Sequence, residues 1–489
     1  MDIIIPHCLS SASFDHKSVS LRFSKTLNNF SFFIKDNYIE NSEFSAGVHA
    51  AVVECYLVHS RIGLDFTLDI KNEFLTKIGS VNRILGEINN LKTQEILYGQ
   101  NNFLTLQIEG KRGELMAILE ELPTVELLDT LDLEPAPDIF LETLILCVKN
   151  YALLEQRRCI KQKNLKKSIL ISEIKSLKKN PILTHQEEIR RAELNLTNHV
   201  EAELKIELQP FESTEHLKNY VASYFKNIYK KRNDINDQID ENSVNTFLGA
   251  DILNKPEVQN AKLTELEKTE LDLPLTVEEL TKSIKKANFK SAPGSNGISN
   301  KFIKQFWTFF KYPLLKYANY AFIEGRLTNS FRTADIKLIP KKGGDLKKIK
   351  NWRPISLLNC FYKVISRAFA ERLKKYMNKL TPCAQKGYAN GRYCQVVFIG
   401  IIDTIETCKV NKTKGGLLSL DIQKAFDSIS HSYLQNIFKC YNFGPNISRW
   451  LTLLSTKRAA RIIINSNIST EIFELERKCS RRHDISFSV

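Results

Sequence analysis

The sequence predicts an α+β protein, in which a mainly helical N-terminal part precedes a domain that mixes helices with a small sheet. Apolar residues recur at helical spacing over long stretches, namely 139–179, 280–287 and 358–380. Short apolar or alternating runs bounded by glycine, proline or asparagine are typical of strands. They occur at 334–340, from 352 onward, at 417–420 and on both sides of 465–467. At 489 residues the chain is long enough for about three domains.

Charge and cysteine usage narrow the class of protein. The formal net charge of +15 suits a polyanionic partner such as RNA or DNA, although a generically basic protein would show the same balance. The ten cysteines are scattered without a Cys-x-x-Cys pair, which predicts reduced thiols. The first residues lack a secretory signal, and the apolar run at 140–148 is too short to span a membrane. We therefore expect no membrane partner and an intracellular location, in the nucleus, the cytoplasm or both.

The N-terminal half divides into three segments by composition. Residues 1–25 contain Asp15-His16 directly before an alternating, strand-like run, and a lone pair of this kind is most often a surface turn. Residues 26–137 carry weak signals and form a connector of unassigned role, which ends in Glu134-Pro-Ala-Pro137. Residues 138–240 are predicted to be a helical, basic connector with Asp138 as an N-cap.

The basic connector contains two predicted helices. The first runs to about residue 179, and the second starts at the capping-box pattern of Thr184 and Glu187 and runs to about residue 208. Lysines give the first helix a basic flank, for which a solvated face and a nucleic-acid-binding face both remain open. These lysines are Lys161, Lys163, Lys166, Lys167, Lys175, Lys178 and Lys179.

The last predicted domain covers residues 241–489. Thr276 and Glu279 have capping-box spacing before a helix. The loop at 290–298 contains a proline, Gly294 and Gly297, so we expect a tight turn with exposed backbone that could lie against a sugar-phosphate chain. The helix at 358–380 carries an apolar stripe that is typical of a core helix.

A hairpin is predicted between 334 and 358. It carries Lys341 on one arm and Arg353 on the other, which together would form a cationic clamp for a triphosphate. Taken alone, Lys341 fits equally well with a lysine that only makes the hairpin tip soluble. Arg353 is more specific, because it lies between a tryptophan and a proline beside an apolar run.

The stretch Gly416-Leu-Leu-Ser-Leu-Asp421 is predicted to be a buried strand that ends on a carboxylate. Asp421 at the end of such a strand would be a hard oxygen ligand for a divalent cation beside a phosphate, although an aspartate here also suits a capped turn. A second hairpin is predicted around 465–467.

Five of these stretches, in this order, resemble the reverse transcriptase of LINE-type (non-LTR) retrotransposons. They are Ser291-Ala-Pro-Gly-Ser-Asn-Gly-Ile298, Leu338-Ile-Pro-Lys-Lys-Gly343, Asn351-Trp-Arg-Pro-Ile-Ser-Leu-Leu-Asn359, Ala384-Gln-Lys-Gly-Tyr388 with Gly391-Arg392, and Ser419-Leu-Asp-Ile-Gln-Lys-Ala-Phe-Asp427. The resemblance implies a right-hand polymerase with fingers and an antiparallel palm sheet. It also implies an RNA template, a DNA primer or target, dNTPs and two Mg²⁺ ions.

The same resemblance implies roles for particular residues. Asp421 matches the first metal-binding aspartate, with the backbone carbonyl of Ile422 as a further ligand. Phe426 matches the aromatic gate below the sugar of the incoming nucleotide, although a core residue would also be aromatic. Lys341 and Arg353 match the residues that hold the triphosphate. Gln385, Gly387 and Arg392 are expected to contact the template or primer backbone.

Three departures from the family pattern shape the expected activity. The family's glycine-containing loop after the hairpin is replaced by a segment with Lys478, Arg481 and Arg482, and the sequence contains no Asp-Asp pair. We also expect the family's thumb and zinc knuckle to be absent. We therefore expect a chain truncated within the palm and inactive on its own, or a non-catalytic nucleic-acid-binding remnant. Asp15-His16 resembles the tail of the endonuclease that accompanies this family, but Phe14 occupies the serine position, so no nuclease activity is expected.

Overall fold

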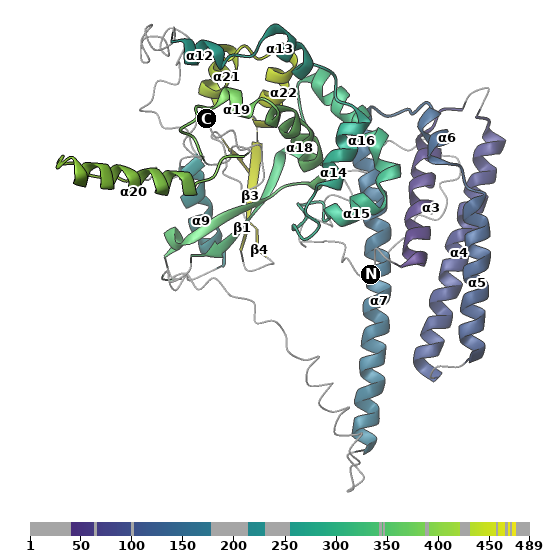
Figure 1. The fold of residues 1–489 in the computed structure, drawn as a ribbon. Coiled ribbons are helices and arrows are strands. Elements are labelled where there is room, and N and C mark those ends of the chain that lie inside the picture. Colours follow the sequence, from purple (N-terminus) through teal and green to yellow (C-terminus); the bar gives the residue numbers. More distant parts are fainter. Residues whose placement is uncertain are drawn as a thin grey trace.

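The computed structural model describes residues 41–62, 66–98, 102–177, 214–229, 255–341, 345, 348–386, 391–420, 431–455, 458–464, 468–469 and 472–475. Long helices lie side by side in its N-terminal part, and shorter helices surround a small sheet in its C-terminal part (Figure 1). The α+β prediction is confirmed at this level. No helix in these residues is both long enough and apolar enough to cross a membrane.

The N-terminal part is a helical bundle. Its helices are α3 (Ser42–His59), α4 (Leu68–Tyr98), α5 (Asn102–Glu120), the short α6 (Val125–Thr130) and α7 (Pro137–Leu177). Helix α3 lies at the centre, and Val48, Val52 and Leu57 on it are completely buried. Helix α7 begins at Pro137, a residue well suited to a first helical turn, and Asp138 lies inside that turn. The predicted N-cap at Asp138 was therefore misplaced.

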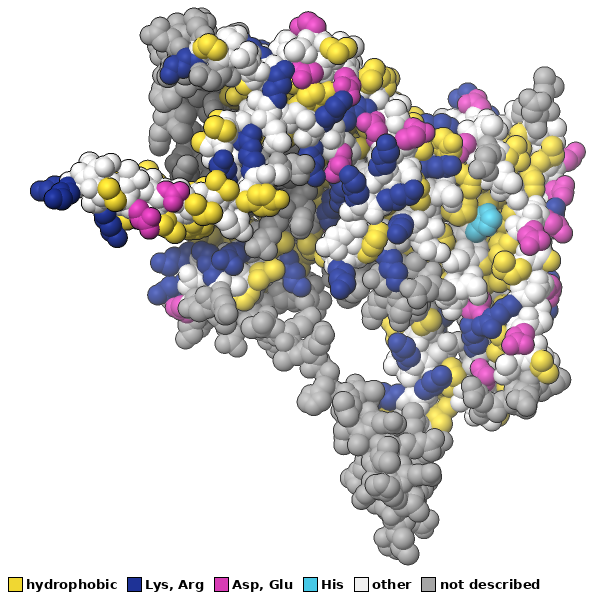
Figure 2. Space-filling view, in the orientation of Figure 1, with side chains coloured by type: hydrophobic (Ala, Val, Ile, Leu, Met, Phe, Trp, Pro, Cys, Tyr) yellow, Lys and Arg dark blue, Asp and Glu magenta, His cyan; other side chains and the backbone are white. Residues whose placement is uncertain are grey.

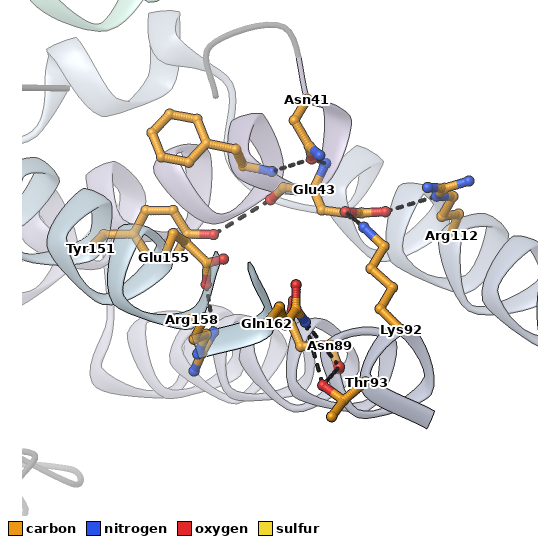
Figure 3. Close-up of polar contacts among 11 residues, drawn as sticks. Asn41, Glu43, Asn89, Lys92, Thr93, Arg112, Tyr151, Glu155, Arg158 and Gln162 are labelled. Carbon is orange, nitrogen blue, oxygen red and sulfur yellow. Dashed lines mark hydrogen bonds and ion pairs between the residues drawn. The ribbon is translucent and has the colours of Figure 1, made fainter. Parts of the chain in front are cut away.

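A charged cluster joins four helices of the bundle (Figure 3). Glu43 on α3 accepts hydrogen bonds from Lys92 on α4 and, at 2.8 Å, from Arg112 on α5. The hydroxyl of Tyr151 on α7 donates to the backbone carbonyl of Glu43 over 3.5 Å. Burial alone would raise the pKa of the Glu43 carboxyl, but the hydrogen bonds and charges of Lys92 and Arg112 outweigh it and lower that pKa.

This cluster makes stability depend on pH in a defined direction. Because the pKa of Glu43 is lower in the folded than in the unfolded state, its contribution is fully present above the unfolded value and is lost as pH falls through the folded value. We expect Glu43→Gln to reduce the loss of stability between about pH 5 and pH 3 in denaturant unfolding. Glu109→Gln, on the exposed side of α5, is the matched control and should leave that loss unchanged.

A second set of helices packs around the apolar faces of α14 (Val277–Lys285), α16 (Trp307–Glu324) and α18 (Cys360–Lys374). The predicted capping box of Thr276 and Glu279 is present at the start of α14, and the predicted stripe at 358–380 forms α18 and the short α19 (Met377–Leu380). The other helices of this set are α12 (Pro256–Asn260), α13 (Glu265–Leu271), α15 (Asn300–Gln305), α17 (Asn329–Arg332), α21 (His431–Cys440) and α22 (Pro445–Ser455).

Helix α7 connects the two parts of the molecule. Its Glu142 accepts hydrogen bonds from the hydroxyls of Ser330 and, at 2.6 Å, Thr328, which lie at the start of α17. Further along α7, burial lowers the pKa of the Lys149 ammonium, the charge of Arg461 lowers it further, and Asp335 opposes this. Through α7 the helical bundle therefore contacts the C-terminal part of the chain and brings Lys149 close enough to Asp335 and Arg461 to feel their charges.

The sheet contains β1 (Thr333–Pro340), β2 (Trp352–Leu357), β3 (Arg458–Ile464), β4 (Ile468–Ser469) and β5 (Phe473–Leu475). The predicted hairpins are confirmed, because β1 and β2 pair antiparallel and β3 pairs antiparallel with β4 and β5. The expectation of a wholly antiparallel sheet was wrong, because β1 and β3 run parallel. These two strands are more than 100 residues apart in sequence, so their pairing depends on long-range packing.

The prediction of a buried strand before Asp421 was also wrong. Residues 413–420 form no regular element, and Leu417, Leu418 and Leu420 are 70%, 78% and 81% exposed. The preceding helix α20 (Gln395–Val410) has no buried residue and extends away from the other elements (Figure 1). A strand needs a paired neighbour to form, and no described strand pairs with this run.

Candidate nucleotide and nucleic-acid site

The hairpin of β1 and β2 brings the two predicted triphosphate ligands to one face of the sheet. Ile339 lies opposite Arg353 and Pro340 opposite Trp352, and the backbone N–H of Lys341 continues the ladder by donating to Asn351 over 2.7 Å. Because side chains alternate along a strand, Lys341 and Arg353 share a face. Arg353 is exposed, as expected for a group that binds a solvent-borne anion.

The opposite face of the hairpin is apolar, and its packing fixes the position of the strands that carry Lys341 and Arg353. Helix α9 (Thr214–Tyr229) packs on it through completely buried Val221 and nearly completely buried Phe225 and Tyr229. Their neighbours in the same cluster are Ile336, Leu338, Ile349, Trp352, Ala460, Ile462, Ile464 and Phe473. The alternation of β1 therefore separates a packed face from a cationic one.

The tip of the hairpin is organised by Asn351, which the sequence analysis did not single out as a site residue. Its side-chain amide donates to the Asp345 carbonyl over 2.9 Å, and its own carbonyl accepts from Lys341. The ammonium of Lys341 donates to the Lys350 carbonyl over 2.9 Å. Asn351 stands in the quoted run Asn351-Trp-Arg-Pro, directly before the strand, and that position was the available signal.

Lys337 is a second residue that the sequence analysis missed. It is exposed and lies two positions before Ile339 and four before Lys341, so period-two counting along β1 would have found it. Arg461 lies on the same face but is paired with Asp335, which stands directly opposite it on the neighbouring strand. The Asp335 carboxylate accepts two hydrogen bonds from the Arg461 guanidinium, at 2.6 and 3.2 Å. Lys337, Lys341 and Arg353 of this face form no ion pair with a carboxylate of the described residues.

The glycine loop at 290–298 is not an exposed backbone surface as predicted. Gly294, Gly297 and Ile298 are buried, and an added Cβ at Gly294 would lie 2.4 Å from backbone atoms of Leu358 and Asn359. Gly297 has a φ of 74°, which favours glycine. The loop thus packs its backbone against the start of α18, where the Asn359 side chain accepts from the Phe361 N–H at 2.9 Å.

The end of β1 and the whole of β2 lie in a region that matches a known protein family. Residues 339–478 match the family model described as reverse transcriptase (RNA-dependent DNA polymerase). These residues form a reverse transcriptase domain of the non-LTR retrotransposon type. The match begins in β1 and includes β2, α18–α22, β3, β4 and β5.

Curated relatives of the reverse transcriptase domain come from mobile elements. The chain is 31% identical over 210 residues to the Transposon TX1 uncharacterized 149 kDa protein of Xenopus laevis, which covers 43% of this chain and 16% of that protein. It is 30% identical over 180 residues to the Retrovirus-related Pol polyprotein from type-1 retrotransposable element R2 of Popillia japonica, a match that covers 37% of this chain and 24% of that protein. It is 28% identical over 181 residues to the RNA-directed DNA polymerase from mobile element jockey of Drosophila melanogaster, a match that covers 36% of this chain and 20% of that protein. The chain spans about a quarter or less of each relative.

Two of the three residues predicted to contact nucleic acid, Gln385 and Arg392, lie in the described part of the reverse transcriptase domain. The Arg392 guanidinium donates to the backbone carbonyls of Gln385, Asn378 and Thr381 at 3.0, 2.9 and 3.1 Å, and also to that of Pro382. Arg392 therefore closes the loop after α19, and Gln385 lies inside this loop. A contact of either side chain with a template or primer stays a prediction, and Gly387 lies outside the described residues.

The predicted metal and sugar sites, Asp421, Ile422 and Phe426, also lie outside the described residues. Within the described part of the chain, no group of three or more histidine, cysteine, aspartate or glutamate side chains could hold a metal ion. The assignment of Mg²⁺ to Asp421 and the Ile422 carbonyl therefore stays a prediction from the family resemblance.

Proposed function

We propose that the protein to which these residues belong is an RNA-directed DNA polymerase, which copies an RNA template from a DNA primer and consumes dNTPs. The observation that carries this proposal is the cationic face of the β1–β2 hairpin inside the matched region, with Lys341 and Arg353 on one side of the strands. A guanidinium can bind two phosphate oxygens at once, and an ammonium adds a compact charge beside it. Non-catalytic nucleic-acid binding is the less favoured function, because the jockey relative is named as a polymerase.

In this proposal each site residue has one role. Lys341, Arg353 and the neighbouring Lys337 hold the triphosphate, and Asn351 positions Lys341 through the hairpin tip. Asp421 and the Ile422 carbonyl would hold Mg²⁺, which stabilises the developing charge on phosphate oxygens when bound. Phe426 would lie below the sugar and exclude a 2′-hydroxyl.

The proposal is tested by the strength with which the next dNTP binds. The chain is incubated with an RNA template and a chain-terminated DNA primer, and the dNTP concentration that stabilises the complex is measured by gel retardation. We expect Arg353→Ala to raise that concentration about thirtyfold, because charged hydrogen bonds contribute about 2 kcal/mol. Arg326→Ala removes an equally charged, exposed side chain just after the end of α16 and should change that dNTP concentration less than twofold. Equal effects of both variants, or no dNTP dependence, would contradict the proposal.

A further inference from the structure

The distal half of α7 has a charge distribution unlike that of the bundle around it. Residues 156–172 contain six cations and no carboxylate. The cations are Arg157, Arg158, Lys161, Lys163, Lys166 and Lys167. Figure 2 shows Lys and Arg side chains along this part of the molecule, where α7 continues past the ends of its neighbours (Figure 1). We call residues 156–172 the cationic segment.

Most cations elsewhere in the described part of the bundle form ion pairs with carboxylates. Lys77 pairs with Glu73 at 2.8 Å and with Glu121 at 3.3 Å. Lys111 pairs with Glu87 and Glu114, both at 2.8 Å. The cationic segment lacks such partners over most of its length.

Four cations of the cationic segment are exposed, and no carboxylate of the described residues lies within ion-pair distance of them. They are Arg157, Lys161, Lys163 and Lys166. The segment is still held in place, because the Gln162 amide donates to the Asn89 carbonyl and the Thr93 hydroxyl of α4, both at 3.4 Å. Positive charge is therefore presented on a positioned helix and not on a free tail.

The angular distribution of these cations selects the kind of partner. Successive helical residues are rotated by about 100°, so Lys166 lies on the opposite side of α7 from Arg157, and Lys163 lies between the two. Cations on opposite sides leave no continuous apolar face for a membrane surface. An A-form duplex is rigid, and its major groove is too narrow to admit a helix. Such a duplex would therefore contact the cations on one side of α7 only. A flexible single strand can follow charges around the helix.

We propose that the cationic segment binds single-stranded RNA through its phosphates, outside the reverse transcriptase domain. The four cations lie within about 14 Å along the helix axis, so one short stretch of strand can contact all of them. Such contacts carry no sequence information, and their strength depends on salt. The choice of RNA over DNA rests on the proposed function.

The test is equilibrium binding of a fluorescent, unstructured 20-nucleotide RNA to the full chain at several salt concentrations. The variant carries Arg157→Gln, Lys161→Gln, Lys163→Gln and Lys166→Gln. A matched control carries Lys255→Gln, Arg326→Gln, Lys374→Gln and Lys409→Gln, which removes the same charge from exposed positions elsewhere. Thermal unfolding of both variants is compared with that of the parent chain to establish that each is folded.

We expect the α7 variant to bind the RNA at least about tenfold more weakly, and the slope of log affinity against log salt to fall by about 3. The control should keep more than half of the parent affinity. Equal losses in both variants, or an equal loss with a 20-base-pair RNA duplex as probe, would overturn the assignment. The dNTP concentration that Arg353→Ala is expected to raise is measured separately, on a primer–template complex. That measurement distinguishes a failure of the proposal for the cationic segment from a failure of the proposed polymerase function.

Discussion

Replacing Asp421 with asparagine is expected to lower nucleotide incorporation at least about a thousandfold, which corresponds to about 4 kcal/mol of transition-state stabilisation. Asparagine has nearly the same size, so the change removes a negative charge and a hard oxygen ligand without removing volume. Mg²⁺ depends on such carboxylates, and the two-metal mechanism depends on Mg²⁺. Incorporation is measured by single-turnover primer extension.

The 489 residues contain no Asp-Asp pair. The extension assay is therefore performed both with the chain alone and with the chain joined to palm strands of a relative that contain such a pair. Asp403→Asn on the exposed surface of α20 is the matched control and should retain activity. Equal incorporation by the Asp421→Asn and parent proteins would show that Asp421 caps a turn and holds no metal.

Replacing Gly294 with alanine is expected to destabilise the C-terminal part of the chain by about 3 kcal/mol, the upper end of the usual cost of overpacking. The added Cβ would lie 2.4 Å from the amide nitrogen of Asn359 and from the carbonyl carbon of Leu358. Backbone atoms at the start of a packed helix cannot rotate away as a flexible side chain could. Because Gly294 does not have a positive φ, the effect is steric and not conformational. The measurement is the free energy of unfolding from denaturant titration.

The control for this change is Gly79→Ala in the middle of α4. Nothing lies within 4 Å of the Cβ position there, so alanine should stabilise the chain by about 0.5–1 kcal/mol through its better helix propensity. Opposite signs for the two substitutions are expected. A neutral Gly294→Ala would mean that the loop at 290–298 does not pack on α18.

Features that depend on neighbouring residues were predictable from the sequence. The capping box of Thr276 and Glu279, the apolar stripe of α18 and both hairpins follow from contacts between residues close in sequence. The shared face of Lys341 and Arg353 follows in the same way, because a hairpin and a period of two decide it. The family was also recognisable from short motifs, since their order does not require the fold.

Features that depend on distant residues were decided by the tertiary structure. The parallel pairing of β1 with β3, the packing of α9 on the sheet and the burial of Gly294 against α18 bring together segments far apart in the chain. The loop around Arg392 is a further case, because its four hydrogen bonds to the carbonyls of residues 378–385 were not predicted from the sequence. Leu417, Leu418 and Leu420 had the composition of a buried strand but are exposed. Composition determines whether a segment can form a strand, and only a neighbouring strand that offers hydrogen-bond partners and an apolar face decides whether it does.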